Sequence, residues 1–142
     1  LTWPENALSQ LRDAGLRRGG ARRAVVDELG LHECCRSAQE IYDGIHDRGG
    51  EAGVASVYRA LDTLVELGLV QRVDVGDGVA RFEPSHTDAQ HHHHLVCDDC
   101  GRVEPFTDPP LERALERAAG RLGYALEQHE VVLRGACDAC RD

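Results

Sequence analysis

The stretch ASVYRALDTLVELG (55–68) and the residues that follow it decide the fold of the first half of the chain. Apolar residues recur in this stretch at steps of three and four, which predicts an amphipathic helix that stops at Gly68. The residues predicted to face inward are Val57, Leu61, Leu64, Val65 and Leu67.

The next stretch, LVQRVDVGDGVARFE (69–83), predicts a β-hairpin. Alternating segments at Val70–Val75 and Val79–Glu83 flank the turn residues Gly76-Asp77-Gly78. Helical patterns precede this region at Ala7–Gly15, Ala21–Gly30 and Ser37–Arg48. A series of helices followed by a hairpin is the element order of a winged helix-turn-helix. In that fold the last helix before the wing enters the DNA major groove.

The second half of the chain predicts a smaller α/β domain. Its expected elements are strands over His91–Cys97, Arg102–Phe106 and His129–Arg134, and a helix over Pro110–Leu122. We therefore predict an α+β protein with a winged helix-turn-helix domain at 1–84, a hinge at 85–90, and a smaller α/β domain at 91–142.

Charge limits the possible partners. The net charge of −9 over 142 residues argues against indiscriminate binding to nucleic acid or to anionic membranes. All 16 basic residues are arginines, and a local cluster of them is either a DNA-contacting patch or a solvated helix face. The cluster consists of Arg12, Arg17, Arg18, Arg22 and Arg23. No apolar run is long enough to span a membrane and no secretory leader is visible, so we expect a cytoplasmic protein.

Four of the six cysteines form two C-x-x-C pairs, Cys97/Cys100 and Cys137/Cys140. Four thiolates on two tight turns match tetrahedral zinc and leave no open coordination position, so we expect a structural site. Such a site stabilises a small domain by on the order of 10 kcal/mol. A redox dithiol is the alternative for one pair, but it does not explain two.

The run HHHHLVCDDC (91–100) places four histidines just before the first pair. Side chains alternate along a strand, so His91 and His93 are predicted to face one way while His92 and His94 face the other. The run could therefore serve two metal sites, or it could be a solvated polar strand. The sequence contains no nucleophile–base pairing and no phosphate-binding loop, so we predict neither an enzyme nor a small-molecule substrate.

Together these motifs resemble the ferric uptake regulator (Fur) superfamily of metal-dependent repressors. The matching stretches are AGL (14–16), SAQEIYDGI (37–45), GVASVYRALDTLVELGLV (53–70), RFE (81–83), HHHHLVCDDCGRVEPF (91–106) and GACDAC (135–140). The resemblance implies a homodimer that binds AT-rich inverted-repeat operators in double-stranded DNA when it is loaded with metal, and that represses metal-homeostasis genes.

The resemblance also implies three metal sites. The structural zinc ligands are Cys97, Cys100, Cys137 and Cys140. The regulatory inter-domain ligands are Cys35, Glu83, His92 and His94, with His86 as a rival or additional ligand. The resemblance further implies that 91–142 is a dimerisation and metal-binding domain. It contains the ligands of a further site, which are His91, His93, Glu112 and His129. Cys35 stands where the family usually has a histidine.

For DNA binding, the resemblance implies roles for Tyr58 and Arg59 on the recognition helix, with Ser56 beside them. Arg17 and Arg22 are the predicted contacts from the basic cluster. The thiol of Cys35 favours Zn(II) over Fe(II) as the regulatory metal, and hence the zinc uptake (Zur) branch over an iron-responsive regulator. The remoter alternative is a zinc storage or chaperone protein that does not bind DNA.

Overall fold

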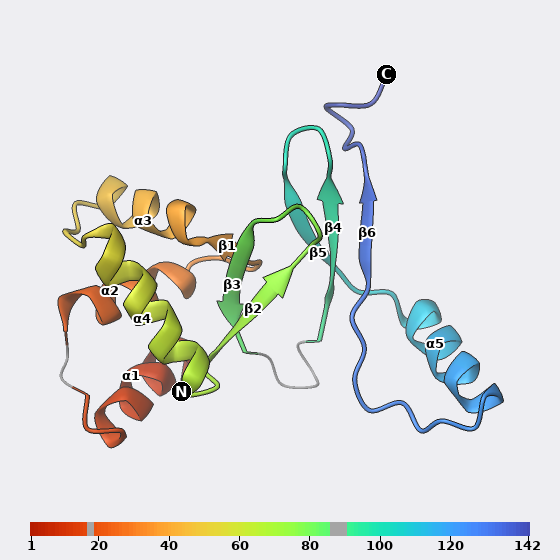
Figure 1. The fold of residues 1–142 in the computed structure, drawn as a ribbon, viewed down its shortest axis with the longest axis horizontal. Coiled ribbons are helices and arrows are strands. Elements are labelled where there is room, and N and C mark those ends of the chain that lie inside the picture. Colours follow the sequence, from red (N-terminus) through yellow and green to blue (C-terminus); the bar gives the residue numbers. More distant parts are fainter. Residues whose placement is uncertain (17–18, 86–90) are drawn as a thin grey trace. The chain divides into compact units, whose positions relative to one another are not determined.

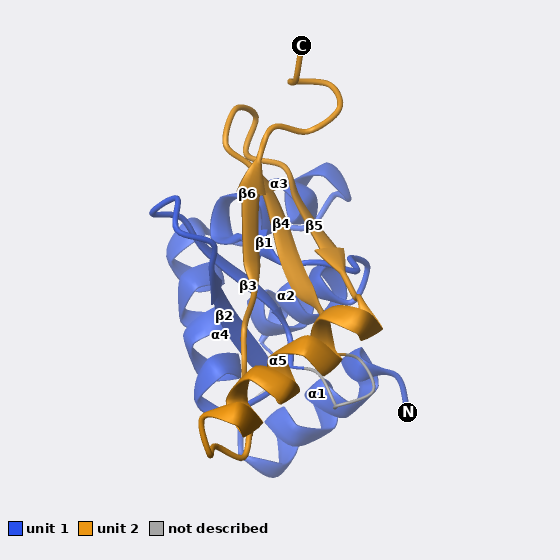
Figure 2. Ribbon diagram, turned by 90° about the vertical axis from the view of Figure 1, so that its right-hand side faces the viewer, with its two compact units in different colours: residues 1–86 blue, residues 87–142 orange. Residues whose placement is uncertain are grey.

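The computed structural model describes residues 1–16, 19–85 and 91–142 (Figure 1). The chain divides into two compact units, Leu1–His86 and Thr87–Asp142, which we call unit 1 and unit 2 (Figure 2). Apart from Ser85, the hinge predicted at 85–90 lies outside the described residues. None of the described helices is long and apolar enough to cross a membrane.

Unit 1 contains the helices α1 (Trp3–Asp13), α2 (Gly20–Leu29), α3 (Ala38–Asp47) and α4 (Val54–Glu66). Helix α1 begins four residues before the predicted start because Thr2 and Glu5 form a capping box. The predicted capping box at α3 is present. The Ser37 hydroxyl accepts from the Glu40 backbone N–H at 3.1 Å, and the Glu40 carboxylate accepts from the Ser37 N–H at 3.0 Å.

The wing is an antiparallel hairpin of β2 (Val70–Asp74) and β3 (Ala80–Pro84), in which Asp74 pairs with Ala80. A two-residue strand that was not predicted, β1 (Arg36–Ser37), pairs with the other side of β3. The sheet order is therefore β1-β3-β2. The β1 pairing places the segment before α3 directly beside the strand that carries Glu83.

The core of unit 1 lies between the helices. Val25, Leu29, Ile41 and Leu61 are completely buried in it, and the wing residue Phe82 packs against them. The predicted inward face of α4 was wrong at two positions, since Val65 and Leu67 are 37% and 40% exposed. Val65 lies on the exposed side of the helix, and Leu67 follows the last helical residue as the C-cap. The small Ala60 is buried instead.

A buried carboxylate joins α2 to α3. Glu28 is 3% exposed, and it accepts from Arg48 Nε at 2.7 Å and lies 3.0 Å from His32 Nε2. Burial alone would raise the pKa of Glu28, but the hydrogen bonds from Arg48 and His32 outweigh it and hold the pKa below its ordinary value. Gly44 of α3 provides the space for this carboxylate, which a Cβ at that position would overlap.

We expect Gly44→Ala to lower the free energy of unfolding of unit 1 by about 1–3 kcal/mol, the usual cost of overpacking. The matched control is Gly20→Ala at the start of α2, where a Cβ meets no atom within 4 Å. Urea denaturation followed by circular dichroism measures both. Equal midpoints for the two variants would contradict the proposed role of Gly44.

Unit 2 contains β4 (His93–Cys97), β5 (Val103–Phe106), the helix α5 (Pro109–Arg121) and β6 (Val132–Gly135). The sheet order is β5-β4-β6, with β4 antiparallel to β5 and parallel to β6. The order of elements agrees with the prediction, although β4 begins at His93 and leaves His91 and His92 outside the strand. The α+β fold class, with a winged-helix unit followed by a unit that carries four cysteines, is confirmed.

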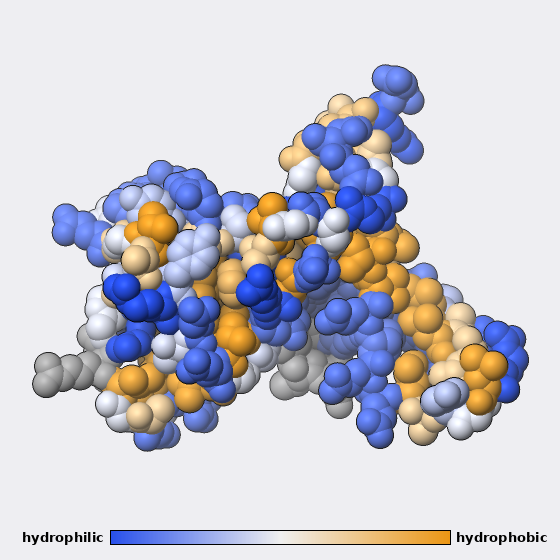
Figure 3. Space-filling model, viewed as in Figure 1, coloured by the Kyte–Doolittle hydropathy of each residue, from blue (hydrophilic) through white to orange (hydrophobic). Residues whose placement is uncertain are grey.

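Unit 2 buries little apolar surface. Within 91–142 the buried apolar side chains are Val96 and Cys97, and α5 has no buried residue. Hydrophobic side chains instead lie at the surface over β6 and α5 (Figure 3). A unit of this size needs further stabilisation, from a metal or from another chain.

Candidate metal centres and nucleic-acid interface

The four cysteines of unit 2 meet at one point. The turn after β4 provides Cys97 and Cys100, and the segment after β6 provides Cys137 and Cys140, so that all four sulfur atoms lie within 4.8 Å of one another. Cys100 Sγ and Cys137 Sγ are 3.8 Å apart. Two sulfurs bound at about 2.3 Å to one tetrahedral zinc ion would be separated by about the same distance, so the donor set fits Zn(II).

Backbone hydrogen bonds prepare this cluster for a cation. The Cys137 N–H donates to Cys97 Sγ at 3.3 Å, and with further backbone N–H groups it lowers the pKa of Cys97 to about 6. The pKa of Cys140 is shifted in the opposite direction. The hydrogen bond between its thiol and Cys137 helps to raise this pKa to about 12. A cation among the sulfurs would favour the thiolate form of all four.

A second cluster in unit 2 contains His91, His93, Glu112 and His129, whose ligand atoms also lie within 4.8 Å of one another. The Glu112 carboxylate bridges the histidines: one oxygen contacts His93 Nε2, and the other lies 2.5 Å from His129 Nε2. Burial raises the pKa of Glu112, but these two contacts outweigh it and keep the pKa below its ordinary value.

The hydrogen bonds of His93 constrain its chemistry. The Val131 backbone N–H donates to His93 Nδ1 at 3.2 Å, so the neutral ring carries its proton on Nε2 and donates it to Glu112. A metal bound to His93 Nε2 would have to displace that proton. The set of three imidazoles and one carboxylate fits a divalent transition metal, and occupation of the site would depend on pH.

Unit 1 brings Cys34, Cys35 and Glu83 together, with their ligand atoms within 4.8 Å of one another. The two sulfurs are 3.8 Å apart, and Glu83 is completely buried and accepts from Gln71 Nε2 at 2.6 Å. The hydrogen bond with Cys34, together with burial, raises the pKa of the Cys35 thiol. Cys34 and Gln71 were not predicted at this site. For Cys34, its adjacency to Cys35 in the sequence was the available signal.

His92 and His94, the other predicted regulatory ligands, lie in unit 2 with ring centroids 4.9 Å apart. The contacts of the odd-numbered and even-numbered histidines thus differ: His91 and His93 gather around Glu112, whereas His92 and His94 lie beside each other. His86 lies outside the described residues.

Three of the predicted DNA contacts lie together in unit 1. Arg22 of α2 and Ser56 and Arg59 of α4 line one surface pocket, and Arg59 donates to Ser56 Oγ at 3.1 Å. Tyr58 is 51% exposed on α4. Neither α2 nor α4 has a side-chain cap at its N-terminus, so backbone N–H groups there are available to a phosphate. Arg17 lies outside the described residues.

Comparison with known proteins decides the family of the chain. A model of the ferric uptake regulator family matches residues 13–134. The chain belongs to this family. It is therefore a Fur-family metal-dependent transcription regulator and not an enzyme. Regulators of the family bind DNA operators as dimers.

Relatives of high coverage agree. The chain is 34% identical over 137 residues to the ferric uptake regulation protein of Neisseria meningitidis, with 96% of this chain and 94% of the relative covered. The crystal structure of the Vibrio cholerae ferric uptake regulator matches at 38% identity and a TM-score of 0.78, and the match covers 89% of this chain and 96% of the other. The Helicobacter pylori Fur structure, at 24% identity and a TM-score of 0.84, shares the fold over 98% of this chain and 94% of the other.

The preference for the zinc uptake branch receives no specific support from these relatives, which are named ferric uptake regulators. They favour the iron-responsive alternative. Family membership also removes the remoter alternative, a zinc protein that does not bind DNA.

Proposed function

We propose that this Fur-family protein is a homodimeric repressor of metal-homeostasis genes that binds AT-rich inverted repeats when an inter-domain site is loaded. Cys35 and Glu83 of unit 1 and His92 and His94 of unit 2 would hold the regulatory metal. The observation that carries the proposal is that each unit presents side chains that can bind a metal: a buried carboxylate beside a thiol in unit 1, and an adjacent histidine pair in unit 2.

A metal held by both units would couple metal binding to the arrangement of the protein that DNA binding requires. It would restrict how unit 1 is oriented on unit 2, and hence the spacing of the two recognition helices in a dimer. That spacing must match half-sites separated by the DNA helical repeat. The gain in operator affinity is limited by how much more tightly the metal binds the DNA-competent arrangement than the others.

Two regulatory metals have specific support. Fe(II) is favoured by the names of the relatives, which are ferric uptake regulation proteins. Zn(II) is favoured by the donor set, since a thiolate with two imidazoles and a carboxylate suits tetrahedral zinc better than six-coordinate, oxygen-rich iron. Under either assignment, Zn(II) is the proposed structural metal at the four cysteines.

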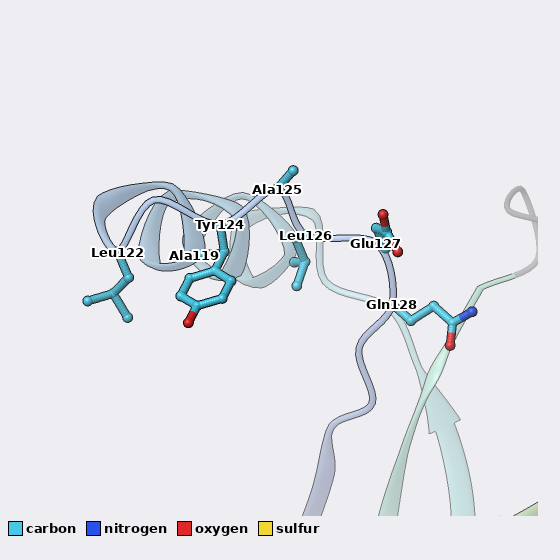
Figure 4. A pocket seen from close by; sticks show the side chains of 7 residues that line it. All are labelled: Ala119, Leu122, Tyr124, Ala125, Leu126, Glu127 and Gln128. Atoms are coloured by element: carbon cyan, nitrogen blue, oxygen red, sulfur yellow. The ribbon is translucent and has the colours of Figure 1, made fainter.

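Exposed apolar side chains support the homodimer. Leu122 and Tyr124 are 78% and 73% exposed, and with Leu126 they point to the same side of the segment that follows α5 (Figure 4). Together with Ala119 and Ala125 they line a surface depression. Contiguous apolar surface of this kind on a small unit marks an interaction site, and a second copy of unit 2 would cover it.

A DNA titration at buffered free metal tests the regulatory site. We expect Cys35→Ala and His92→Ala each to abolish the metal-dependent gain in affinity for an inverted-repeat operator, because each removes one ligand of the metal that links the units. Fluorescence anisotropy at controlled free Fe(II) and Zn(II) measures the effect and identifies the metal.

The matched control is Glu116→Ala, because Glu116 is exposed on α5 and belongs to none of the proposed ligand sets; this variant should keep the metal-dependent gain of the unmodified protein. If Cys35→Ala and His92→Ala both keep the metal dependence of the unmodified protein, the coupling is wrong.

A further inference from the structure

We propose that Cys34 is a second thiolate ligand of the regulatory metal, so that unit 1 binds it through two adjacent sulfurs and the Glu83 carboxylate. This inference rests on the proposed function and extends it, because Cys34 is not part of the ligand set that the resemblance implies. A second thiolate would also strengthen the preference of the site for thiophilic metals over Fe(II) and Mn(II).

The sulfur positions carry the argument. Cys34 Sγ and Cys35 Sγ are 3.8 Å apart, the same separation as Cys100 Sγ and Cys137 Sγ in the four-cysteine cluster. Two thiolates that bind one ion at about 2.3 Å, at a tetrahedral angle to each other, are about 3.8 Å apart, so one ion can contact both sulfurs without a change in their separation. Neighbouring side chains on a strand would point to opposite faces, but this pair lies before β1 and does not alternate.

The third donor is already oriented. Glu83 lies on β3, whose pairing with β1 through Arg36 and Phe82 fixes the strand beside the cysteine pair. The Gln71 amide donates to one Glu83 oxygen, Oε1, at 2.6 Å, which fixes the orientation of the carboxylate. A hydrogen bond of this kind from outside the ligand set is typical of metal-binding carboxylates. A cation at this point would also offset the cost of burying the carboxylate.

Two thiolates give the site a preference for soft metals. Thiolate ligands select zinc and other thiophilic ions, whereas Mn(II) and Fe(II) sites of this type are built from imidazole and carboxylate. Exchanging Cys34 for serine would replace a soft donor with a hard, weakly coordinating one. The change should therefore weaken the binding of Zn(II) and Cd(II) while leaving that of Mn(II) nearly unchanged.

Cobalt spectroscopy on the full-length dimer provides the test. The four-cysteine cluster is first filled with Zn(II), and the reduced protein is then titrated with Co(II). We expect thiolate-to-cobalt charge-transfer absorbance in the near ultraviolet, reduced to about half in Cys34→Ser and in Cys35→Ser because each keeps one of two thiolates. The double variant corrects for Co(II) that exchanges into the four-cysteine cluster, and circular dichroism with bound zinc confirms folding.

Full absorbance in Cys34→Ser, with unchanged Zn(II) affinity in a chelator competition, would overturn the role of Cys34 while leaving the repressor proposal intact. The proposed function fails in a different way. If Cys35→Ala and His92→Ala both keep the metal dependence of DNA binding seen in the unmodified protein, the proposed coupling is wrong, even where the cobalt spectra of Cys34→Ser and Cys35→Ser show two thiolates.

Discussion

Replacing Cys97 by serine is expected to abolish the folding of unit 2 and, with it, dimerisation and operator binding. Val96 and Cys97 are the buried apolar side chains within 91–142, and α5 buries none. A metal that cross-links the β4 turn and the segment after β6 would therefore supply much of the stability. Bound zinc should fall by one ion per chain, as measured by elemental analysis. The thermal transition of unit 2 should disappear in calorimetry.

The control for this variant is Asp99→Asn, in the same C-x-x-C turn. Asp99 is exposed and lies between the two cysteines, so its amide analogue keeps the turn and all four sulfurs. It should retain zinc and remain dimeric in sedimentation experiments. A cooperative, dimeric Cys97→Ser protein without bound zinc at this cluster would show that the cluster is not structural.

Removing Tyr58 and Arg59 together should eliminate specific DNA binding without affecting the metal sites. Arg59 lies with Ser56 and Arg22 around one pocket at the surface of unit 1, and Tyr58 projects from the same helix. Direct contacts of this type contribute about 1–3 kcal/mol each, so the double alanine variant should bind an operator half-site roughly 30- to 20,000-fold more weakly. Fluorescence anisotropy at saturating metal and fixed salt gives the ratio.

Arg117→Ala is the charge-matched control, because Arg117 is exposed on α5 in unit 2 and its loss removes one positive charge. Its operator affinity should change only by the small factor expected from net charge. The salt dependence of binding should fall in the Arg59 variant if that guanidinium contacts a phosphate. Metal-dependent DNA retardation that survives the Tyr58 and Arg59 substitutions would show that α4 is not the recognition helix.

The sequence was sufficient to predict the fold class because its local patterns agree with one another. The period of α4, the Gly76-Asp77-Gly78 turn and the Ser37–Glu40 capping box each specify an element by short-range chemistry, and the structure contains all three. The start of α1 was missed because the capping box at Thr2 lies before the apolar pattern begins. The exposure of Val65 and Leu67 was missed because periodicity gives a helix face only to within about one residue.

By itself the sequence determined which residues could bind metal: the two C-x-x-C pairs, the alternating histidines and Cys35. The resemblance implied how these residues group with Glu83, Glu112 and His129, and only the tertiary structure decided the contacts among them. It placed Glu112 of α5 between His93 and His129, and it placed Glu83 of β3 beside Cys34 and Cys35. It also revealed the hydrogen bond that leaves a proton on His93 Nε2, and the 3.8 Å separation that makes Cys34 a candidate ligand. The physical reason is that ligand sets depend on the register of strands and on side-chain rotamers, which are fixed by packing between segments far apart in the chain.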